Sequence, residues 1–186
     1  PAFAHALTTA DGLETDVVCS LDGVPYLIHN STIRFVPYVF SWAARSGPDI
    51  RRMHSSEIDD IVLKDGSNIL RLSELFELSA HMPTRKILNL ELKAPDTARP
   101  VLSAIDFAEK KNWIDRSQII ISSFDHDEIA MVQRLDPSIK TGVIFWQDSM
   151  RPCRLYPWSE KYRAQALPLS IANLESEQVR KILPDY

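Results

Sequence analysis

The chain has 186 residues and a net charge of −4, with 45% hydrophobic and 25% charged residues, which is typical of a globular protein with one sizeable core. The negative balance and the lack of a basic stripe argue against nucleic acid as a partner. No apolar run reaches the roughly 18 residues that a membrane span needs. The two cysteines, Cys19 and Cys153, belong to no Cys/His ligand pattern, so neither zinc nor a disulfide scaffold is expected.

Strand and helix patterns alternate along most of the chain. In chain order they are a helix at Ala2–Thr9, strands at Leu13–Cys19 and Pro25–His29, a helix at Arg71–Ser79, a strand at Ile87–Leu92, a helix at Ala98–Lys111, a strand at Ile119–Ser122, a helix at Asp127–Leu135, a strand at Thr141–Phe145, a weaker strand at Ala166–Ser170 and a helix at Glu175–Leu183. This alternation predicts an α/β fold of parallel βα units. The strand count fits an open doubly wound sheet and also a (β/α)₈ barrel that lacks its ends.

Three local signals refine these predictions. Leu21–Val24 reads Leu-Asp-Gly-Val, a tight turn that predicts a hairpin between the first two strands. Asp125, followed three residues later by Glu128, is a capping arrangement for the start of a helix. Asp136-Pro137 then ends that helix, because proline cannot continue it.

Carboxylates occupy one face of two of the predicted strands. Glu14 and Asp16 lie two residues apart in LETDVV, so a strand directs both side chains to the same face. In ILNLELKAP, Glu91 lies between two leucines and so occupies the polar face of the strand Ile87–Leu92. Like charges side by side are destabilising unless a positive charge holds them. Oxygen-only ligands suit Mg²⁺ or Ca²⁺. Ion pairs to Lys or Arg explain the pattern equally well, so the residues alone leave both readings open.

His29 is a candidate for proton transfer. It ends the second strand, and the tight turn brings that strand back beside Glu14 and Asp16. A lone histidine at a strand end is more often a hydrogen-bonded structural residue, but an imidazole that ionises near neutral pH suits acid/base chemistry at the same edge. The other histidines fit surface or capping roles; they are His5, His54, His81 and His126.

Several stretches together resemble the glycerophosphodiester phosphodiesterase family. They are GLETDVVCSLDGVPYLIHN, LRLSELFELS, LNLELK and IIISSFDHDEIAMVQRLDPSIKTGVIF, and the resemblance extends from Ala2 to about Leu183. It implies a (β/α)₈ barrel that hydrolyses glycerophosphodiesters to glycerol 3-phosphate and an alcohol, with a divalent metal, Mg²⁺ or Ca²⁺. By motif, Glu14, Asp16 and Glu91 match the metal-binding carboxylates, His29 a catalytic histidine and Lys93 the phosphate-binding lysine.

The chain departs from the family pattern in places. The His-Arg pair of the family's first strand and its closing strands are not found, so residues 1–186 are expected to be a single domain truncated at both ends, and inactive alone. Asn30 stands where the family usually has Asp, and Ile33–Val36 also differ, which leaves the substrate open. The alternatives are a related lyase or synthase acting on sphingophospholipids or sugar phosphodiesters, or a non-catalytic phosphodiester-binding member. No signal peptide is visible, which slightly favours the cytoplasm while leaving the compartment unknown.

Overall fold

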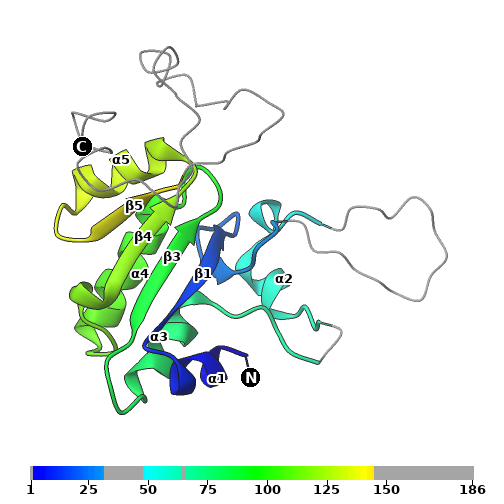
Figure 1. Cartoon of the computed structure of the whole chain (residues 1–186). Coiled ribbons are helices and arrows are strands. Elements are labelled where there is room, and N and C mark those ends of the chain that lie inside the picture. The colour runs from blue at the N-terminus through cyan, green and yellow to red at the C-terminus, as the bar shows by residue number, and fades with distance from the viewer. Residues whose placement is uncertain (1, 32–47, 64–65, 145–186) are drawn as a thin grey trace, which may run out of the picture. The chain divides into compact units, whose positions relative to one another are not determined.

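A computed structural model of the chain describes residues 2–31, 48–63 and 66–144 (Figure 1). Its elements are α1 (Ala2–Thr9), β1 (Gly12–Cys19), β2 (Pro25–Leu27), the 3₁₀ turn η1 (Ile50–Arg52), α2 (Ser55–Asp59), α3 (Leu72–Ala80), β3 (Ile87–Leu92), α4 (Ala98–Lys110), the 3₁₀ turn η2 (Arg116–Gln118), β4 (Ile119–Ser123), α5 (His126–Leu135) and β5 (Lys140–Val143). None of the helices in these ranges is long and apolar enough to cross a membrane.

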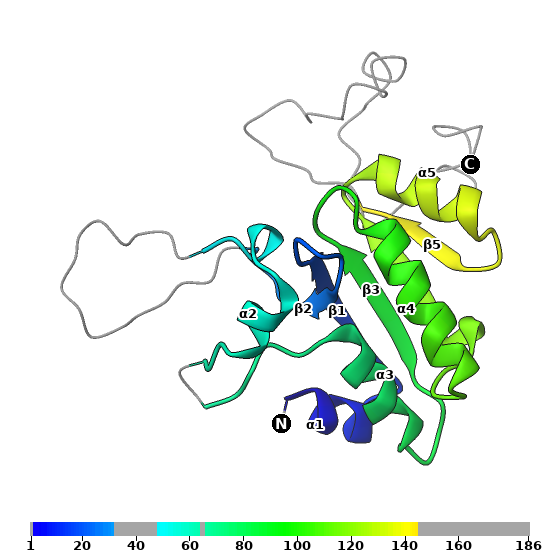
Figure 2. The ribbon, with the colours of Figure 1, turned by 180° about the vertical axis from the view of Figure 1, so that it is seen from behind.

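The strands form one mixed sheet in the order β2-β1-β3-β4-β5. β1, β3, β4 and β5 run parallel, while β2 returns antiparallel beside β1. Parallel neighbours require a crossover, and α4 and α5 supply it between β3 and β4 and between β4 and β5. The helices α3 and α4 lie behind the sheet in Figure 1 and in front of it in Figure 2, so they cover one face of the sheet.

Alternation along the strands separates a buried face from a polar one. On β3, Leu88, Leu90 and Leu92 are at most 1% exposed and belong to the main core with residues of α3, α4 and α5. Asn89 and Glu91 project from the opposite face, because successive side chains of a strand point to opposite sides. The sheet therefore presents its polar face away from the helices that carry its core.

A second apolar cluster holds residues 48–63 against the hairpin. Tyr26 of β2 is fully buried in it, packed with Val18, Ile50, Ile58, Ile61 and Ile69. The Tyr26 hydroxyl donates a hydrogen bond to Asp59 Oδ1 at 2.7 Å. Arg71, just before α3, forms an ion pair with the same carboxylate and lies over the Tyr26 ring. These contacts fix the base of the hairpin that leads to His29.

The Asp59 contacts predict how stability depends on pH. The hydrogen bond from Arg71 holds the pKa of Asp59 below its usual value, although burial opposes this. Since the folded pKa lies below the unfolded one, the stabilising contribution is present above about pH 4 and is lost as the pH falls through the folded pKa. We expect Asp59→Asn to lower the free energy of unfolding by about 1–2 kcal/mol at pH 7 and by less at pH 3, measured with urea.

The control for this measurement is Asp60→Asn, which changes the exposed neighbouring carboxylate. A surface change of this kind is expected to stay within about 0.5 kcal/mol. A difference between the Asp59 variant and the unmutated protein that persists unchanged at pH 3 would contradict the role given to the ion pair.

The hairpin prediction is confirmed, with one difference at its end. Gly23 has φ 78°, a left-handed conformation that favours glycine, and the turn joins β1 to an antiparallel β2. β2 ends at Leu27, so His29 lies two residues beyond the strand instead of within it. The short α2 and the 3₁₀ turns were not predicted, because elements of three to five residues show no clear periodicity. The predicted strand Ala166–Ser170, the predicted helix Glu175–Leu183 and Phe145 lie outside the described residues.

The capping prediction at α5 is right for one of its two residues. Asp125 is the N-cap residue of α5 and accepts a hydrogen bond from the Asp127 N–H at 3.1 Å. Glu128 instead accepts hydrogen bonds from backbone N–H groups at the start of the neighbouring helix α4. The sequence pattern relates only residues that are near one another along the chain. It therefore does not show that the N-terminus of α4, in another βα unit, lies within hydrogen-bond distance of Glu128.

Candidate active site

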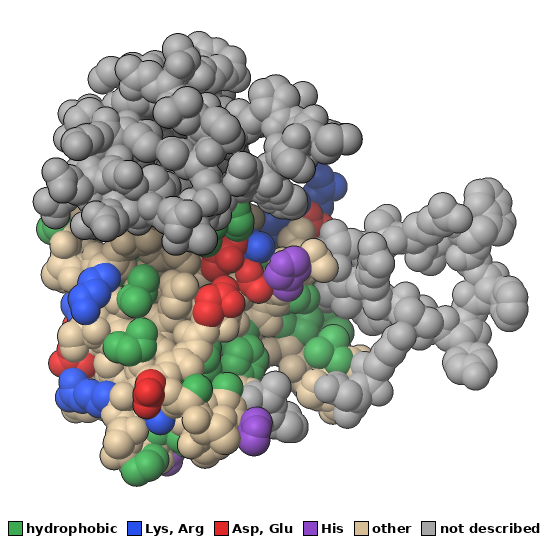
Figure 3. Space-filling view, viewed as in Figure 1, with side chains coloured by type: hydrophobic (Ala, Val, Ile, Leu, Met, Phe, Trp, Pro, Cys, Tyr) green, Lys and Arg blue, Asp and Glu red, His purple; other side chains and the backbone are tan. Residues whose placement is uncertain are grey.

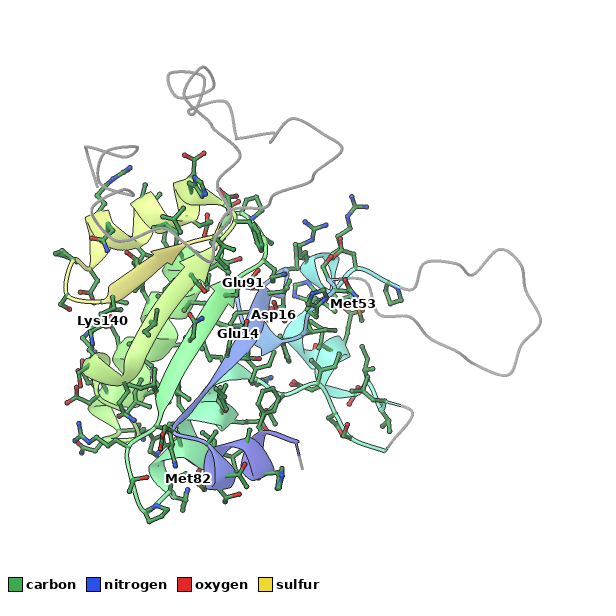
Figure 4. All side chains as sticks on the ribbon, in the orientation of Figure 1. Glu14, Asp16, Met53, Met82, Glu91 and Lys140 are labelled. Carbon is green, nitrogen blue, oxygen red and sulfur yellow. The ribbon has the colours of Figure 1, made fainter. Side chains whose placement is uncertain are left out.

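The three predicted carboxylates meet on the polar face of the sheet. Glu14 and Asp16 project from β1 and Glu91 from β3, as the side chains labelled in Figure 4 show. In the parallel pairing of these strands, Asp16 lies opposite Glu91 and Glu14 opposite Asn89. One carboxylate oxygen from each of the three residues lies within 4.8 Å of the others. The register of two strands far apart in sequence thus assembles a cluster of carboxylate oxygens.

Lys93, just after β3, is the cation closest to this cluster in the part of the chain that the structure describes. Its Nζ lies 2.8 Å from Glu91 Oε1 and 3.2 Å from Asp16 Oδ1. These side chains are largely shielded, with exposed fractions of 22% for Lys93, 17% for Asp16 and 12% for Glu91. Burial acts against the ammonium, but the bonds to both carboxylates outweigh it, and the pKa of Lys93 is raised.

Glu14 is the exposed member of the cluster. Burial raises the pKa of Glu14, and the charges of Asp16 and Glu91 raise it further, against the opposing effects of Lys93 and His29. Within the described ranges ion pairs reach Asp16 and Glu91 but not Glu14. Three carboxylates around one ammonium leave excess negative charge, and all the ligand atoms are oxygens. The residues therefore fit a divalent cation such as Mg²⁺ or Ca²⁺.

His29 borders this cluster from the hairpin. The Ile28 N–H donates to the Asp16 carbonyl oxygen at 3.1 Å, which holds the chain leaving β2 beside β1. The imidazole is exposed, and its Nδ1 lies 3.2 Å from Asn30 Oδ1. Its charge acts on the ionisation of Glu14. In Figure 3 a histidine stands next to the acidic side chains in the centre of this face, with a basic side chain beside them.

Two further side chains of this face had no predicted role. Ser122 of β4 lies opposite Glu91 in the sheet, and its hydroxyl donates to Asn89 Oδ1 at 2.9 Å. Phe124, directly after β4, places its ring 5.8 Å from Lys93 Nζ and is 37% exposed. Asn89 shares the alternation of Glu91, so the sequence places it on this face. Ser122 and Phe124 are recognised only once the register of β3 and β4 is known.

Comparison with known proteins places the chain in a family. The family model described as the glycerophosphoryl diester phosphodiesterase family matches residues 1–182. The chain belongs to this family. A glycerophosphodiester phosphodiesterase of Caldanaerobacter subterraneus is 25% identical to this chain over 185 residues. The match covers 90% of this chain and 67% of that protein.

Solved structures of the family share the fold. The glycerophosphodiester phosphodiesterase from Agrobacterium tumefaciens is 26% identical with a TM-score of 0.56, and the match covers 75% of this chain but only 56% of that one. A phosphodiesterase of Oleispira antarctica, solved in complex with the product sn-glycerol-3-phosphate, gives a TM-score of 0.61 at 18% identity and covers 98% of this chain and 73% of that one.

These similarities confirm the predicted α/β fold of the (β/α)₈ barrel type. The chain spans just over half the length of the Agrobacterium protein. In such barrels the active site lies at the carboxyl ends of the parallel strands. Glu91 is the next-to-last residue of β3 and Lys93 follows that strand, so the carboxylate cluster lies toward this end of the sheet.

Proposed function

We propose that this protein hydrolyses glycerophosphodiesters to glycerol 3-phosphate and an alcohol with the help of a divalent metal. The observation that carries the proposal is the meeting of Glu14, Asp16 and Glu91 around Lys93 in a chain of this family. The product bound to the Oleispira phosphodiesterase supports glycerol 3-phosphate as the product here.

Each residue has a role in this proposal. Glu14, Asp16 and Glu91 would hold Mg²⁺ or Ca²⁺, and the bound cation would supply positive charge for the phosphoryl oxygens. Lys93 extends from the same cluster and would bind a phosphate oxygen through its ammonium, which adds to the stabilisation of developing negative charge. His29, at the exposed border, would transfer a proton between water, phosphodiester and leaving alcohol.

The test is release of glycerol 3-phosphate by the full-length protein from a panel of glycerophosphodiesters with different head groups. Release should stop when a chelator removes divalent ions and return when Mg²⁺ or Ca²⁺ is added back. Metal-dependent formation of a cyclic phosphate in place of glycerol 3-phosphate would favour the lyase alternative. Binding of sn-glycerol 3-phosphate without any turnover would favour a non-catalytic phosphodiester-binding protein.

A further inference from the structure

Glu128 is a buried carboxylate that the proposed chemistry does not use. It projects from the first turn of α5 and is 7% exposed. Its Oε1 accepts a hydrogen bond from the Asp96 N–H at 2.8 Å, and its Oε2 accepts from the N–H groups of Thr97 and Ala98 at 3.0 and 2.6 Å. One side chain of the β4–α5 unit thus binds three consecutive backbone groups of the β3–α4 unit.

The three N–H groups have no alternative cap from their own helix. Thr97 is the N-cap residue of α4, but its side chain makes no cap bond, because its hydroxyl donates to the Ala94 carbonyl at 2.6 Å. The first N–H groups of a helix lack partners within the helix and carry its positive dipole end, so a carboxylate there is favourable. Burial nevertheless raises the pKa of Glu128, although the backbone hydrogen bonds oppose it.

The carboxylate holds a loop as well as a helix end. Asp96 precedes α4 and has φ 63°, a left-handed conformation that is uncommon outside glycine, although aspartate adopts it more readily than most residues. The same loop is bound at its start, where the Ser123 hydroxyl donates to the Leu92 carbonyl at 2.6 Å. Lys93 lies between these two anchors, directly after Leu92 and three residues before Asp96.

We propose that Glu128 is a positioning residue for Lys93, acting through the β3–α4 loop; this rests on the phosphate-binding role proposed for Lys93. The Lys93 backbone N–H donates to the Val17 carbonyl at 3.1 Å, so the start of the loop is aligned with β1. Glu128 fixes the other end. With both ends held, the Lys93 ammonium stays within reach of Asp16 and Glu91 and of a phosphate bound beside them.

Chemical labelling of lysines in the full-length protein tests the proposal without any ligand. In Glu128→Gln one oxygen acceptor is replaced by an amide NH₂, so at least one charge-assisted bond to the loop is lost. Lys93 should then react with acetic anhydride about tenfold faster, as measured by mass spectrometry well below the melting temperature. Lys140, which is exposed on β5, serves as the internal reference and should be unchanged.

The matched control is Glu74→Gln, because Glu74 also places a carboxylate at a helix start, accepting the Arg71 N–H at 2.7 Å on α3. It should leave Lys93 labelling unchanged. An unchanged Lys93 rate in Glu128→Gln, together with a lowered melting temperature, would overturn the proposal and leave Glu128 as a helix cap only.

A double-mutant cycle then connects the positioning to ligand binding. Glu128→Gln should raise the dissociation constant for sn-glycerol 3-phosphate, measured by calorimetry, about tenfold. In a Lys93→Met background the same change should have an effect below about twofold, because the lysine through which Glu128 acts is gone. An equal effect in both backgrounds would refute the route through Lys93. If the unmutated protein neither binds sn-glycerol 3-phosphate nor cleaves glycerophosphodiesters, the proposed function fails, while the labelling result still decides the role of Glu128.

Discussion

Glu91→Gln should abolish metal-dependent turnover of glycerophosphodiesters while leaving the fold nearly intact. The change removes the charge of one proposed metal ligand and almost no volume from a side chain that is 12% exposed on β3. A metal site contributes several kcal/mol of charge stabilisation to the reaction, so we expect turnover to fall by about a thousandfold or more. The measurement is the rate of glycerol 3-phosphate release at saturating Mg²⁺ or Ca²⁺.

Measuring Ca²⁺ binding by the same variant distinguishes the loss of a metal ligand from other causes of lost turnover. Calorimetry should show weaker Ca²⁺ binding in Glu91→Gln than in the unmutated protein, and circular dichroism should show the same secondary structure. The control is Glu109→Gln, which alters a carboxylate of α4 that pairs with Arg116 away from the cluster, and its turnover should stay within about twofold. Full activity in Glu91→Gln would show that Glu91 is not a ligand.

The sequence predicted which face of each strand the candidate carboxylates occupy, because that pattern is local to each strand. Alternation in Leu13–Cys19 and Ile87–Leu92 places Glu14, Asp16 and Glu91 on one face whatever the rest of the chain does. It does not say which residues lie opposite one another. The pairing of Asp16 with Glu91 is a register between strands about 75 residues apart, and it requires the tertiary structure.

The choice between ion pairs and a metal illustrates the same limit. From the sequence the two explanations were equal, and the structure shows ion pairs for two of the three carboxylates. Lys93 forms ion pairs with Asp16 and Glu91, whereas within the described residues no ion pair reaches Glu14, so a metal at the cluster stays a proposal. LELK shows a lysine two residues after Glu91, but the number of carboxylates with which this lysine forms ion pairs depends on distances that only the fold sets.

Glu128 marks where the sequence reading failed, and the reason is physical. A carboxylate in the first turn of a helix fits that helix's own start, and Asp125 with Glu128 has the spacing of such a cap. In the structure Asp125 binds its own helix, while Glu128 turns to the N-terminus of α4, whose own N-cap side chain bonds elsewhere. Contacts between successive βα units determine which helix end such a carboxylate binds. A sequence pattern within one unit does not show these contacts.

His29→Gln should lower turnover by about a hundredfold to ten-thousandfold while leaving metal binding unchanged, because it removes a proton-transfer group and no carboxylate. The imidazole is exposed and lies outside β2, so the free energy of unfolding should change by less than about 0.5 kcal/mol. This combination distinguishes it from Glu91→Gln, in which turnover and metal binding fall together. The matched control is His5→Gln, an exposed histidine on α1, for which activity should be unaltered.

The pH profile gives the sharper measurement for His29. If its imidazole transfers the proton, the dependence of kcat/KM on pH should lose in His29→Gln the limb that this group contributes. A fall in kcat/KM with the profile unchanged in shape would mean that His29 contributes to binding and that another group moves the proton. Unchanged turnover would remove His29 from the reaction altogether and leave the carboxylates and Lys93 as the catalytic groups of the described site.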